Sequence, residues 1–210
     1  MYVVDRDFGF APNPFHGFCT LATCMPQIRA KATGDDWIVG MGGRRLKATG
    51  RCVYAMRVTD TRTFDQYWAE KEFFDKRPVR NGSRVMMVGD NIYRRETPNG
   101  DWVQLDSHHS NPDGTPNQLN IDKDTRADRV LISRDFYYFG RNAPPVPAEI
   151  LKALGFKNKI GHRKFNTAGR DSFLSWLLQN HAGDRNFVVA DPFDFEKTEK
   201  RYSGRGSKLL

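Results

Sequence analysis

The side chains best suited to chemistry lie in one polar stretch, residues 106–124, which reads DSHHSNPDGTPNQLNIDKD. Two adjacent histidines, His108 and His109, stand there among aspartates and asparagines with few apolar neighbours. A histidine titrates near neutral pH, and a nearby carboxylate fixes its tautomer and raises its pKa. If the protein is an enzyme, this pattern favours acid–base catalysis, with Asp106, His108 and His109 as the catalytic residues. Each histidine is equally consistent with a structural role, bonding a backbone carbonyl.

Metal binding fits this stretch less well. His109 to Asn120 follows the spacing of a calcium-binding loop, but His and Asn replace the carboxylates needed at its two ends. Asp106 and His108 would share one face of an extended segment, yet zinc needs further ligands. The remaining candidate ligands do not have the paired spacing of a zinc finger: His16, Cys19, Cys24 and His162. We therefore predict no metal and no cofactor.

A cysteine nucleophile and a phosphate-binding loop are not evident either. Cys19 follows His16 at a short distance, but it lies among Phe18, Leu21 and Ala22, which favours a buried apolar thiol. Residues 40–43 (GMGG) are too short to be a dinucleotide or P-loop motif.

The segment Phe8–Phe18 (FGFAPNPFHGF) combines aromatic rings with turn-forming residues. Its rings are more often core than ligand contacts, but an aromatic wall could also stack a base. We predict that this segment, residues 106–124 and Tyr138 surround one cleft. In that cleft the ligand-binding residues would be Asn13, Phe15, Asp106, His108, Asn117, Asn120 and Tyr138.

The charge of the chain is uneven. Its formal net charge is +8, and most of the excess lies after residue 140. Residues 157–170 carry five Lys or Arg and no acidic residue. Such a patch suits phosphate, although a solvated basic face would look the same. The predicted phosphate-binding residues are Lys159, Arg163, Lys164 and Arg170.

The elements that must position these residues are short. Strands are predicted at 2–5, 36–41, 51–59, 129–133, 136–139 and 187–190, and a hairpin turn at Pro98–Gly100. Helices are predicted from Pro26, from Thr63 (a capping box with Gln66) to about 75, between Pro147 and Gly155, and over 172–181. Residues 106–124 are expected to be a loop. The pattern predicts an α+β fold with a mixed or antiparallel β-sheet, open or closed as a barrel, and peripheral helices.

Length and composition indicate one domain, residues 1–195, followed by a basic, flexible tail, residues 196–210. No window approaches the roughly 18 consecutive apolar residues that a membrane span requires. With no visible signal peptide and three unpaired-looking cysteines, we expect a cytoplasmic protein without a membrane partner.

Several long segments together resemble the nucleotide-modification-associated domain family of the second type, found in bacteria and phages. The resemblance spans roughly residues 2–195 and departs from the family at an extra acid in Gly34–Trp37 and in the tail. It implies a link to modified DNA but carries over no specific activity. The segments that carry it are DRDFGFAPNPFHGFCTLATC (5–24), GDNIYRR (89–95), DSHHSNPDGTPN (106–117), RVLISRDFYYFG (129–140) and GHRKF (161–165).

Three functions follow from the sequence. The first is a module that binds a nucleotide, a modified base or nucleic acid, with the rings stacking the base and the basic patch holding phosphate. The second is an enzyme acting on a nucleotide or nucleobase, with His108 or His109 as the acid–base residue and Asp106 orienting it. We favour the first function, in which His108 reads the ligand, and we expect His109 to be structural. The third is a protein-interaction domain. Measured conversion of a nucleotide or nucleobase would distinguish the enzyme from the binding module.

Overall fold

The computed structural model describes residues 1–159, 161–165, 167–203 and 208–209. Its strands form several small sheets that are mostly antiparallel and do not close into a barrel within the described ranges. The largest sheet has the order β1 (Tyr2–Val4), β3 (Trp37–Gly42), β4 (Cys52–Arg57), β9 (Asp135–Tyr138), and only β1 runs parallel to its neighbour. The second sheet has the order β2 (Cys19–Leu21), β8 (Val130–Ser133), β5 (Asp60–Arg62).

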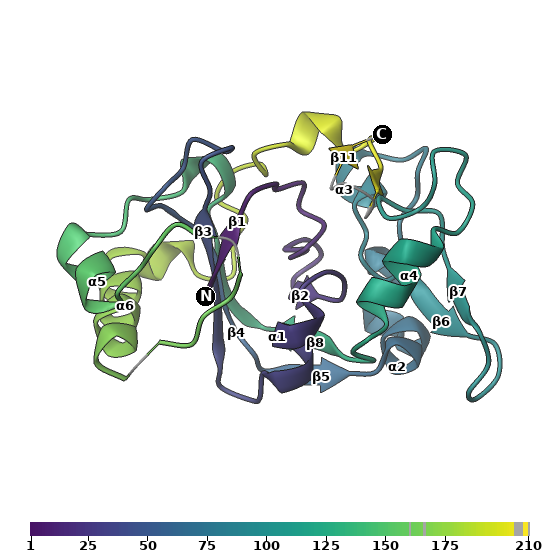
Figure 1. Ribbon diagram of the computed structural model, residues 1–210, viewed down its shortest axis with the longest axis horizontal. Helices are drawn as coiled ribbons and strands as arrows, with labels where there is room; N and C mark the ends of the chain where they lie inside the picture. Colours follow the sequence, from purple (N-terminus) through teal and green to yellow (C-terminus); the bar gives the residue numbers. More distant parts are fainter. Residues whose placement is uncertain (160, 166, 204–207, 210) are drawn as a thin grey trace.

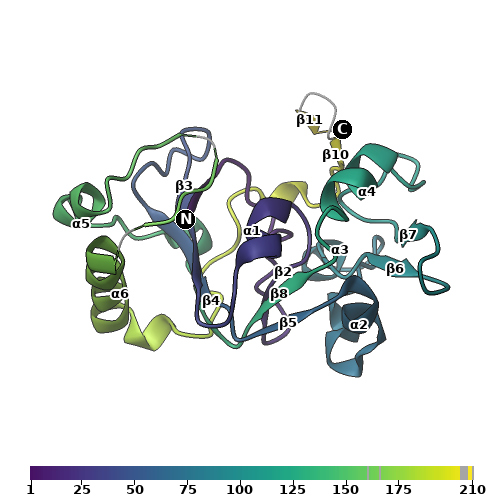
Figure 2. The same ribbon diagram turned by 60° about the horizontal axis from the view of Figure 1, so that its bottom comes forward.

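Helices and hairpins cover these sheets on their outer sides (Figures 1 and 2). The helices α5 (Ala148–Ala153) and α6 (Thr167–Asn180) lie beyond the first sheet. Beyond the second sheet lie α2 (Phe64–Ala69), α4 (Gln118–Asp124) and the hairpin of β6 (Tyr93–Arg95) and β7 (Trp102–Gln104). The described elements also include the short helices α1 (Pro26–Lys31) and α3 (Arg84–Met87) and the small hairpin of β10 (Tyr202–Ser203) and β11 (Lys208–Leu209). Four 3-10 turns complete them: Lys71–Lys76, Gly140–Asn142, Ala182–Asp184 and Phe195–Lys197.

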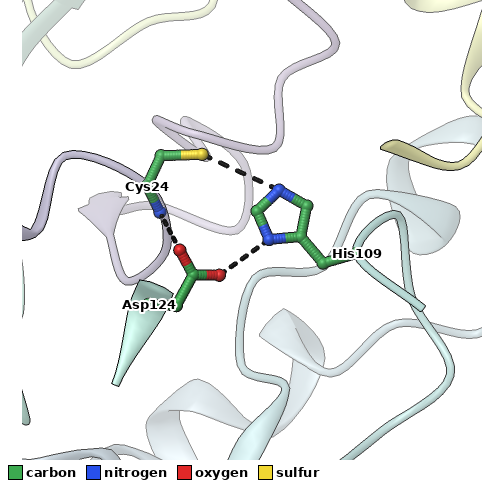
Figure 3. Close-up of side chains that lie close together, drawn as sticks. All are labelled: Cys24, His109 and Asp124. Carbon is green, nitrogen blue, oxygen red and sulfur yellow. Dashed lines mark hydrogen bonds and ion pairs between the residues drawn. The ribbon is translucent and has the colours of Figure 1, made fainter. Parts of the chain in front are cut away.

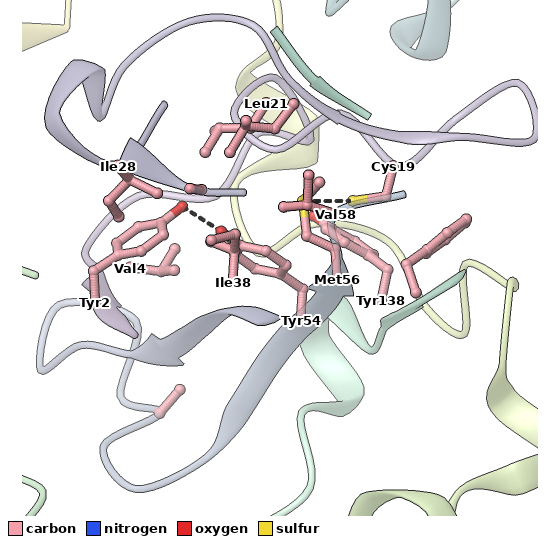
Figure 4. Packing of buried hydrophobic residues seen from close by; sticks show 14 of the residues in the cluster. Tyr2, Val4, Cys19, Leu21, Ile28, Ile38, Tyr54, Met56, Val58 and Tyr138 are labelled. Carbon is pink, nitrogen blue, oxygen red and sulfur yellow. Dashed lines mark hydrogen bonds between the residues drawn. The ribbon is translucent and has the colours of Figure 1, made fainter. Parts of the chain in front are cut away.

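The core has three layers because the central strands bury both faces. Along β4, Tyr54 and Met56 pack toward the second sheet, whereas Val53 and Ala55 pack toward α5 and α6. Figure 4 shows the layer between the two sheets, where the Tyr54 hydroxyl donates to the hydroxyl of Tyr2 at 2.8 Å. This two-sided burial confirms the strand predicted at 51–59.

Local signals predicted most of the other elements correctly. The capping box at Thr63 and Gln66 is present, the helix beginning at Pro26 is α1, and the turn at Pro98–Gly100 joins β6 to β7. The mixed α/β class with a mixed, mostly antiparallel set of sheets is likewise confirmed.

Four local predictions are wrong. The predicted loop 106–124 ends in α4, which the Asn117 side chain caps. The helix expected from 172 begins earlier, at Thr167, and its added first turn contains Gly169, where the backbone of α5 and the following residue lies close. The helix from Thr63 ends at Ala69 and continues as a 3-10 turn, which leaves Phe74 41% exposed. The strand expected at 187–190 is only an isolated pairing of Val188 with Tyr138.

One buried cation, Arg29 of α1, joins distant parts of the chain. Its guanidinium donates to the carbonyl of Cys24 at 2.9 Å and to the carbonyls of Ala127 and Arg129 at 2.6 Å each, and it also contacts the Asp124 carbonyl. The side chain is fully buried. It therefore satisfies carbonyl groups at the end of α4 and before β8 that would otherwise lie buried without donors.

We expect Arg29→Met to lower the free energy of unfolding by about 3–5 kcal/mol, because it leaves several buried carbonyls without a donor. Urea denaturation followed by circular dichroism measures this change. The control is Arg126→Met, an exposed arginine, for which a change within about 0.5 kcal/mol is expected. Equal unfolding midpoints for the two variants would contradict the role given to Arg29.

Candidate functional site

A cavity of about 410 Å³ lies where the opening strand, the aromatic segment and the histidine pair meet. Its walls combine aromatic rings, two arginines, one aspartate, both histidines and a cysteine. The lining residues are Val3, Asp5, Arg6, Phe8, Phe10, Ala11, Cys24, Arg45, His108, His109 and Tyr202. The polar stretch and the aromatic segment therefore do converge on one cavity, as the sequence predicted for these two segments.

Cys24 and His109 of this cavity form a connected row with Asp124, which lies behind His109 and does not line the cavity (Figure 3). The Nδ1 of His109 lies 2.7 Å from Oδ2 of Asp124, and its Nε2 lies 3.7 Å from Sγ of Cys24. His109 and Asp124 are buried, while Cys24 is half-buried at the cavity wall. A carboxylate, an imidazole and a thiol in this order are the parts of an activated cysteine nucleophile.

Asp124 fixes the geometry of the row. Besides the contact with His109, its Oδ1 accepts the backbone N–H of Cys24 at 2.8 Å and its Oδ2 accepts the hydroxyl of Tyr93 at 3.0 Å. Burial raises the pKa of this carboxyl, but the His109 imidazolium and the Arg29 guanidinium outweigh it and hold the pKa below its ordinary value. Asp124 is therefore ionised and can orient the imidazole.

His109 carries the positive charge of the row. Burial lowers its pKa, but the Asp124 carboxylate and the Cys24 sulfur raise it to about 10. Its backbone carbonyl accepts from the side chains of Asn120 at 2.7 Å and Gln104 at 3.3 Å, which fixes the main chain that carries the ring.

The thiol sits at a strained turn between β2 and α1. Cys24 has φ 57° and Met25 has φ 38°, a left-handed backbone that non-glycine residues adopt at an energetic cost. The N–H of Cys24 bonded to Asp124 and the carbonyl bonded to Arg29 hold this conformation. The turn presents Sγ to the cavity at the point where the helix begins.

His108 is the uncharged partner of the pair. Its Nδ1 donates to the carbonyl of Lys200 at 2.7 Å, and its ring packs on Phe8 and Phe10 at centroid distances of 4.5 and 5.3 Å. Burial and the positive charge of His109 lower its pKa to about 3. Its Nε2 is therefore a hydrogen-bond acceptor in the cavity wall.

The same three side chains could be considered as metal ligands, since their ligand atoms lie within 4.8 Å of one another. However, Nδ1 of His109 and both oxygens of Asp124 are already engaged in hydrogen bonds. Sγ and Nε2 alone do not make the three or four protein ligands that zinc requires. The geometry fits a catalytic row better than a metal centre.

The sequence-predicted ligand residues lie mostly outside the cavity wall. Asn13 donates to Val88 and accepts from the buried Lys76, Phe15 stacks on Phe195, and the Tyr138 hydroxyl donates to Asp7 at 2.5 Å. These three side chains contact other parts of the protein, and the cleft expected around Tyr138 instead surrounds Phe8, Phe10 and the histidines.

Within the polar stretch, His108 and His109 line the cavity and the other predicted residues support them. Asp106 pairs with Arg201 rather than with a histidine. Asn117 caps α4, and Asn120 donates to the carbonyls of His109 and Tyr202. The tail residues Lys200–Tyr202, expected to be flexible, thus lie against the histidine pair.

The predicted phosphate-binding residues belong to another part of the surface. Arg163, Lys164 and Arg170 line a second cavity together with Lys31. Lys159 is exposed nearby in sequence but is not among the lining residues. The basic residues and the histidine pair therefore do not share one cavity.

Sequence reasoning did not place Cys24 beside the His109 imidazole and did not identify Asp124 as the partner of that ring. Cys24 had one local signal, because it directly precedes Met25 and Pro26 at a strand-to-helix turn. Asp124 had none that distinguished it from the other aspartates of the stretch. Its separation of 100 residues from Cys24 is closed only by the tertiary fold.

Fold and site together define a mixed α/β domain with a buried Cys–His–Asp row at the wall of an aromatic cavity. The chain belongs to the family described as nucleotide modification associated domain 2, whose model matches residues 1–199. The family resemblance found in the sequence is thereby confirmed, and the family description ties the chain to nucleotide modification. Searches of curated proteins and of solved structures each found no match. Among the described residues, no helix has the length and apolarity to cross a membrane.

The two histidines should make the free energy of unfolding depend on pH in opposite directions. The pKa of His108 falls to about 3 on folding, so its contribution is lost as pH falls from about 6.5 toward 3. The pKa of His109 rises to about 10, so its contribution is full below about 6.5 and is lost as pH rises toward 10. Each slope is at most about 1.4 kcal/mol per pH unit.

Urea unfolding at pH 4.5 to 8 measures these slopes. Relative to the parent, His108→Gln should flatten the loss of stability between pH 6.5 and 4.5. His109→Gln should instead flatten a loss above pH 6.5. Comparing each variant with the parent cancels other titrating groups, and identical slopes in all three proteins would exclude the assigned charge states.

Proposed function

We propose that the protein is a cysteine-dependent enzyme acting on a nucleotide or nucleobase. Cys24 supplies the nucleophile, His109 is the acid–base residue and Asp124 orients it. The observation that carries this proposal is the row from Asp124 through His109 to Cys24, with 2.7 Å and 3.7 Å between successive atoms, at the wall of a cavity. The family description supplies the class of substrate.

The chemistry available to this row is addition to an electrophilic carbon. The lone pair of the Cys24 thiolate forms a carbon–sulfur bond, and the π electrons of the attacked double bond move to its far atom. That atom takes the proton from Nε2 of His109, whose positive charge the Asp124 carboxylate stabilises. Return of the proton to Nε2 and departure of the thiolate alone would only reverse this addition. Net turnover therefore requires water or another nucleophile to add to the adduct before the thiolate leaves and the enzyme is regenerated.

The cavity walls suit a planar, polar substrate. Phe8, Phe10 and Tyr202 offer ring faces, and the Nε2 of His108 offers a hydrogen-bond acceptor to an amino or imino group. These contacts also support the second candidate function, a module that binds a nucleotide or modified base without turnover. The Cys–His–Asp row favours the enzyme, because simple binding would not require a thiol aligned with an imidazolium.

The reactivity of Cys24 tests the row without knowledge of the substrate. Iodoacetamide should alkylate Cys24 in the folded protein but spare Cys19 and Cys52, which are fully buried. At pH 6, His109→Gln should slow alkylation of Cys24 by roughly tenfold or more, since the variant removes the positively charged ring whose Nε2 lies 3.7 Å from Sγ.

Peptide mass spectrometry after timed quenching follows each cysteine separately. The matched control is His181→Gln, which removes a histidine–aspartate contact elsewhere in the chain and should leave the rate at Cys24 unchanged. If His109→Gln and the parent react at the same rate, the histidine does not activate the thiol and the proposal fails.

Turnover separates the enzyme from the binding module. In a screen of natural and modified nucleotides by liquid chromatography and intact-protein mass spectrometry, Cys24→Ala and His109→Gln should lower the rate by about 10²–10⁴. His108→Gln should mainly weaken binding, by about 1–3 kcal/mol measured by calorimetry. Binding that depends on His108, with no product or adduct for any nucleotide in the parent, would favour the module.

A further inference from the structure

A second cavity, of about 210 Å³, lies between α1, β3, α6 and the segment 161–165. The histidine site does not use it. Its walls contain three large aromatic rings, from Trp37, Phe165 and Phe173, and its cations come from three separate elements of the fold. The cationic residues that line it are Lys31, Arg163, Lys164 and Arg170.

The basic side of this cavity is fixed to the sheet. The N–H of Arg163 donates to the carbonyl of Met1 at 2.9 Å, and His162 pairs with Tyr2 of β1. Lys164 and Arg170 are exposed, so their charges face solvent at the rim. Asp36 is the one acidic residue among those that line the cavity, against four Lys or Arg. The arrangement complements an anion that carries an aromatic ring.

The two cavities are neighbours in the fold. Met1 lines the second cavity and Val3 lines the first, so two residues at the start of the chain, about 7 Å apart at strand spacing, reach both. The turn into α1 also reaches both cavities, since Cys24 lines the first cavity and Gln27 lines the second. The first cavity also carries cations, Arg6 and Arg45. A chain of linked nucleotides could therefore occupy both.

We propose that the second cavity binds the nucleotide adjacent to the one that reacts at Cys24, so that the substrate is a single-stranded nucleic acid. This inference rests on the proposed function. The base stacks against Trp37 or Phe165, and Arg163, Lys164 and Arg170 hold the phosphates on either side. Stacking on rings combined with a cationic groove is the general means by which proteins bind single strands without reading their sequence.

Fluorescence anisotropy with labelled thymidine oligonucleotides of one, two, four and eight residues tests this proposal. Affinity should rise at least tenfold from one residue to four, because a longer strand reaches both cavities. An RNA series of the same lengths runs in parallel, and length dependence in either series supports the proposal. Equal affinity for all lengths in both series, or no binding in either, would overturn it.

The variant Arg163→Ala/Lys164→Ala/Arg170→Ala should bind the four-residue strand at least tenfold more weakly and bind the mononucleotide as the parent does. Loss of three phosphate contacts should reduce the slope of log affinity against log salt by about 2. The matched control, Lys71→Ala/Arg84→Ala/Arg126→Ala, removes the same charge from exposed positions that do not line the second cavity and should keep the slope. Equal losses in the two variants would show a general charge effect and overturn the proposal.

The single variant Lys164→Glu guards against misfolding, because its side chain is exposed. It should weaken binding of the four-residue strand and leave binding of the mononucleotide and the alkylation rate of Cys24 unchanged. Normal alkylation with no dependence on strand length would overturn the second cavity alone. An alkylation rate independent of His109 would overturn the proposed function instead, so the two failures are distinguishable.

Discussion

The guanidinium of Arg29 is the contact on which the geometry of the site depends. It lies fully buried and bonds to the carbonyl of Cys24 on one side and to carbonyls after α4 on the other. Asp124 is the last residue of α4, so the group that fixes the thiol turn also fixes the carboxylate. The N–H of Cys24 bonded to Asp124 closes this link. Arg29 and this hydrogen bond therefore hold Cys24 and Asp124, which are 100 residues apart in the sequence, in a fixed relative position.

The histidine pair shows how neighbouring side chains acquire opposite charge states. His109 has a buried carboxylate partner and is a cation, whereas His108 has a carbonyl and two phenyl rings and stays neutral. The charge of His109 itself helps to keep His108 neutral, because two adjacent buried cations would repel each other. One ring is then a cation beside the Cys24 sulfur, and the other is an uncharged part of the cavity wall.

Local patterns in the sequence predicted elements that have local causes. The Thr63–Gln66 capping box and the proline at the start of α1 act within one helical turn, and both elements form as expected. The α+β fold class and the convergence of the aromatic segment on the histidines could also be predicted, since both rest on runs of residue types. The sequence likewise indicated that Cys19 is buried.

Only part of the site could be predicted from the sequence. The histidines stood out by type, but their roles depend on partners that no spacing reveals: Asp124 for His109 and the Lys200 carbonyl for His108. The pattern therefore favoured Asp106 as the orienting acid and His108 as the reader, and treated His109 as structural. Asp106 in fact pairs with Arg201. Charge pairing across the fold decides these roles, and it is invisible in a linear pattern.

The wall that Tyr202 contributes has a consequence for how the family can diversify. The ring of Tyr202 lies 5.7 Å from that of His109 and borders the cavity, while the family match ends at residue 199. Cys24, His109 and Asp124 all lie inside the match. Among the described residues that line the cavity, Tyr202 is the one outside the family match. A substitution at this position would therefore change the shape of the cavity wall without changing any residue that the family model covers.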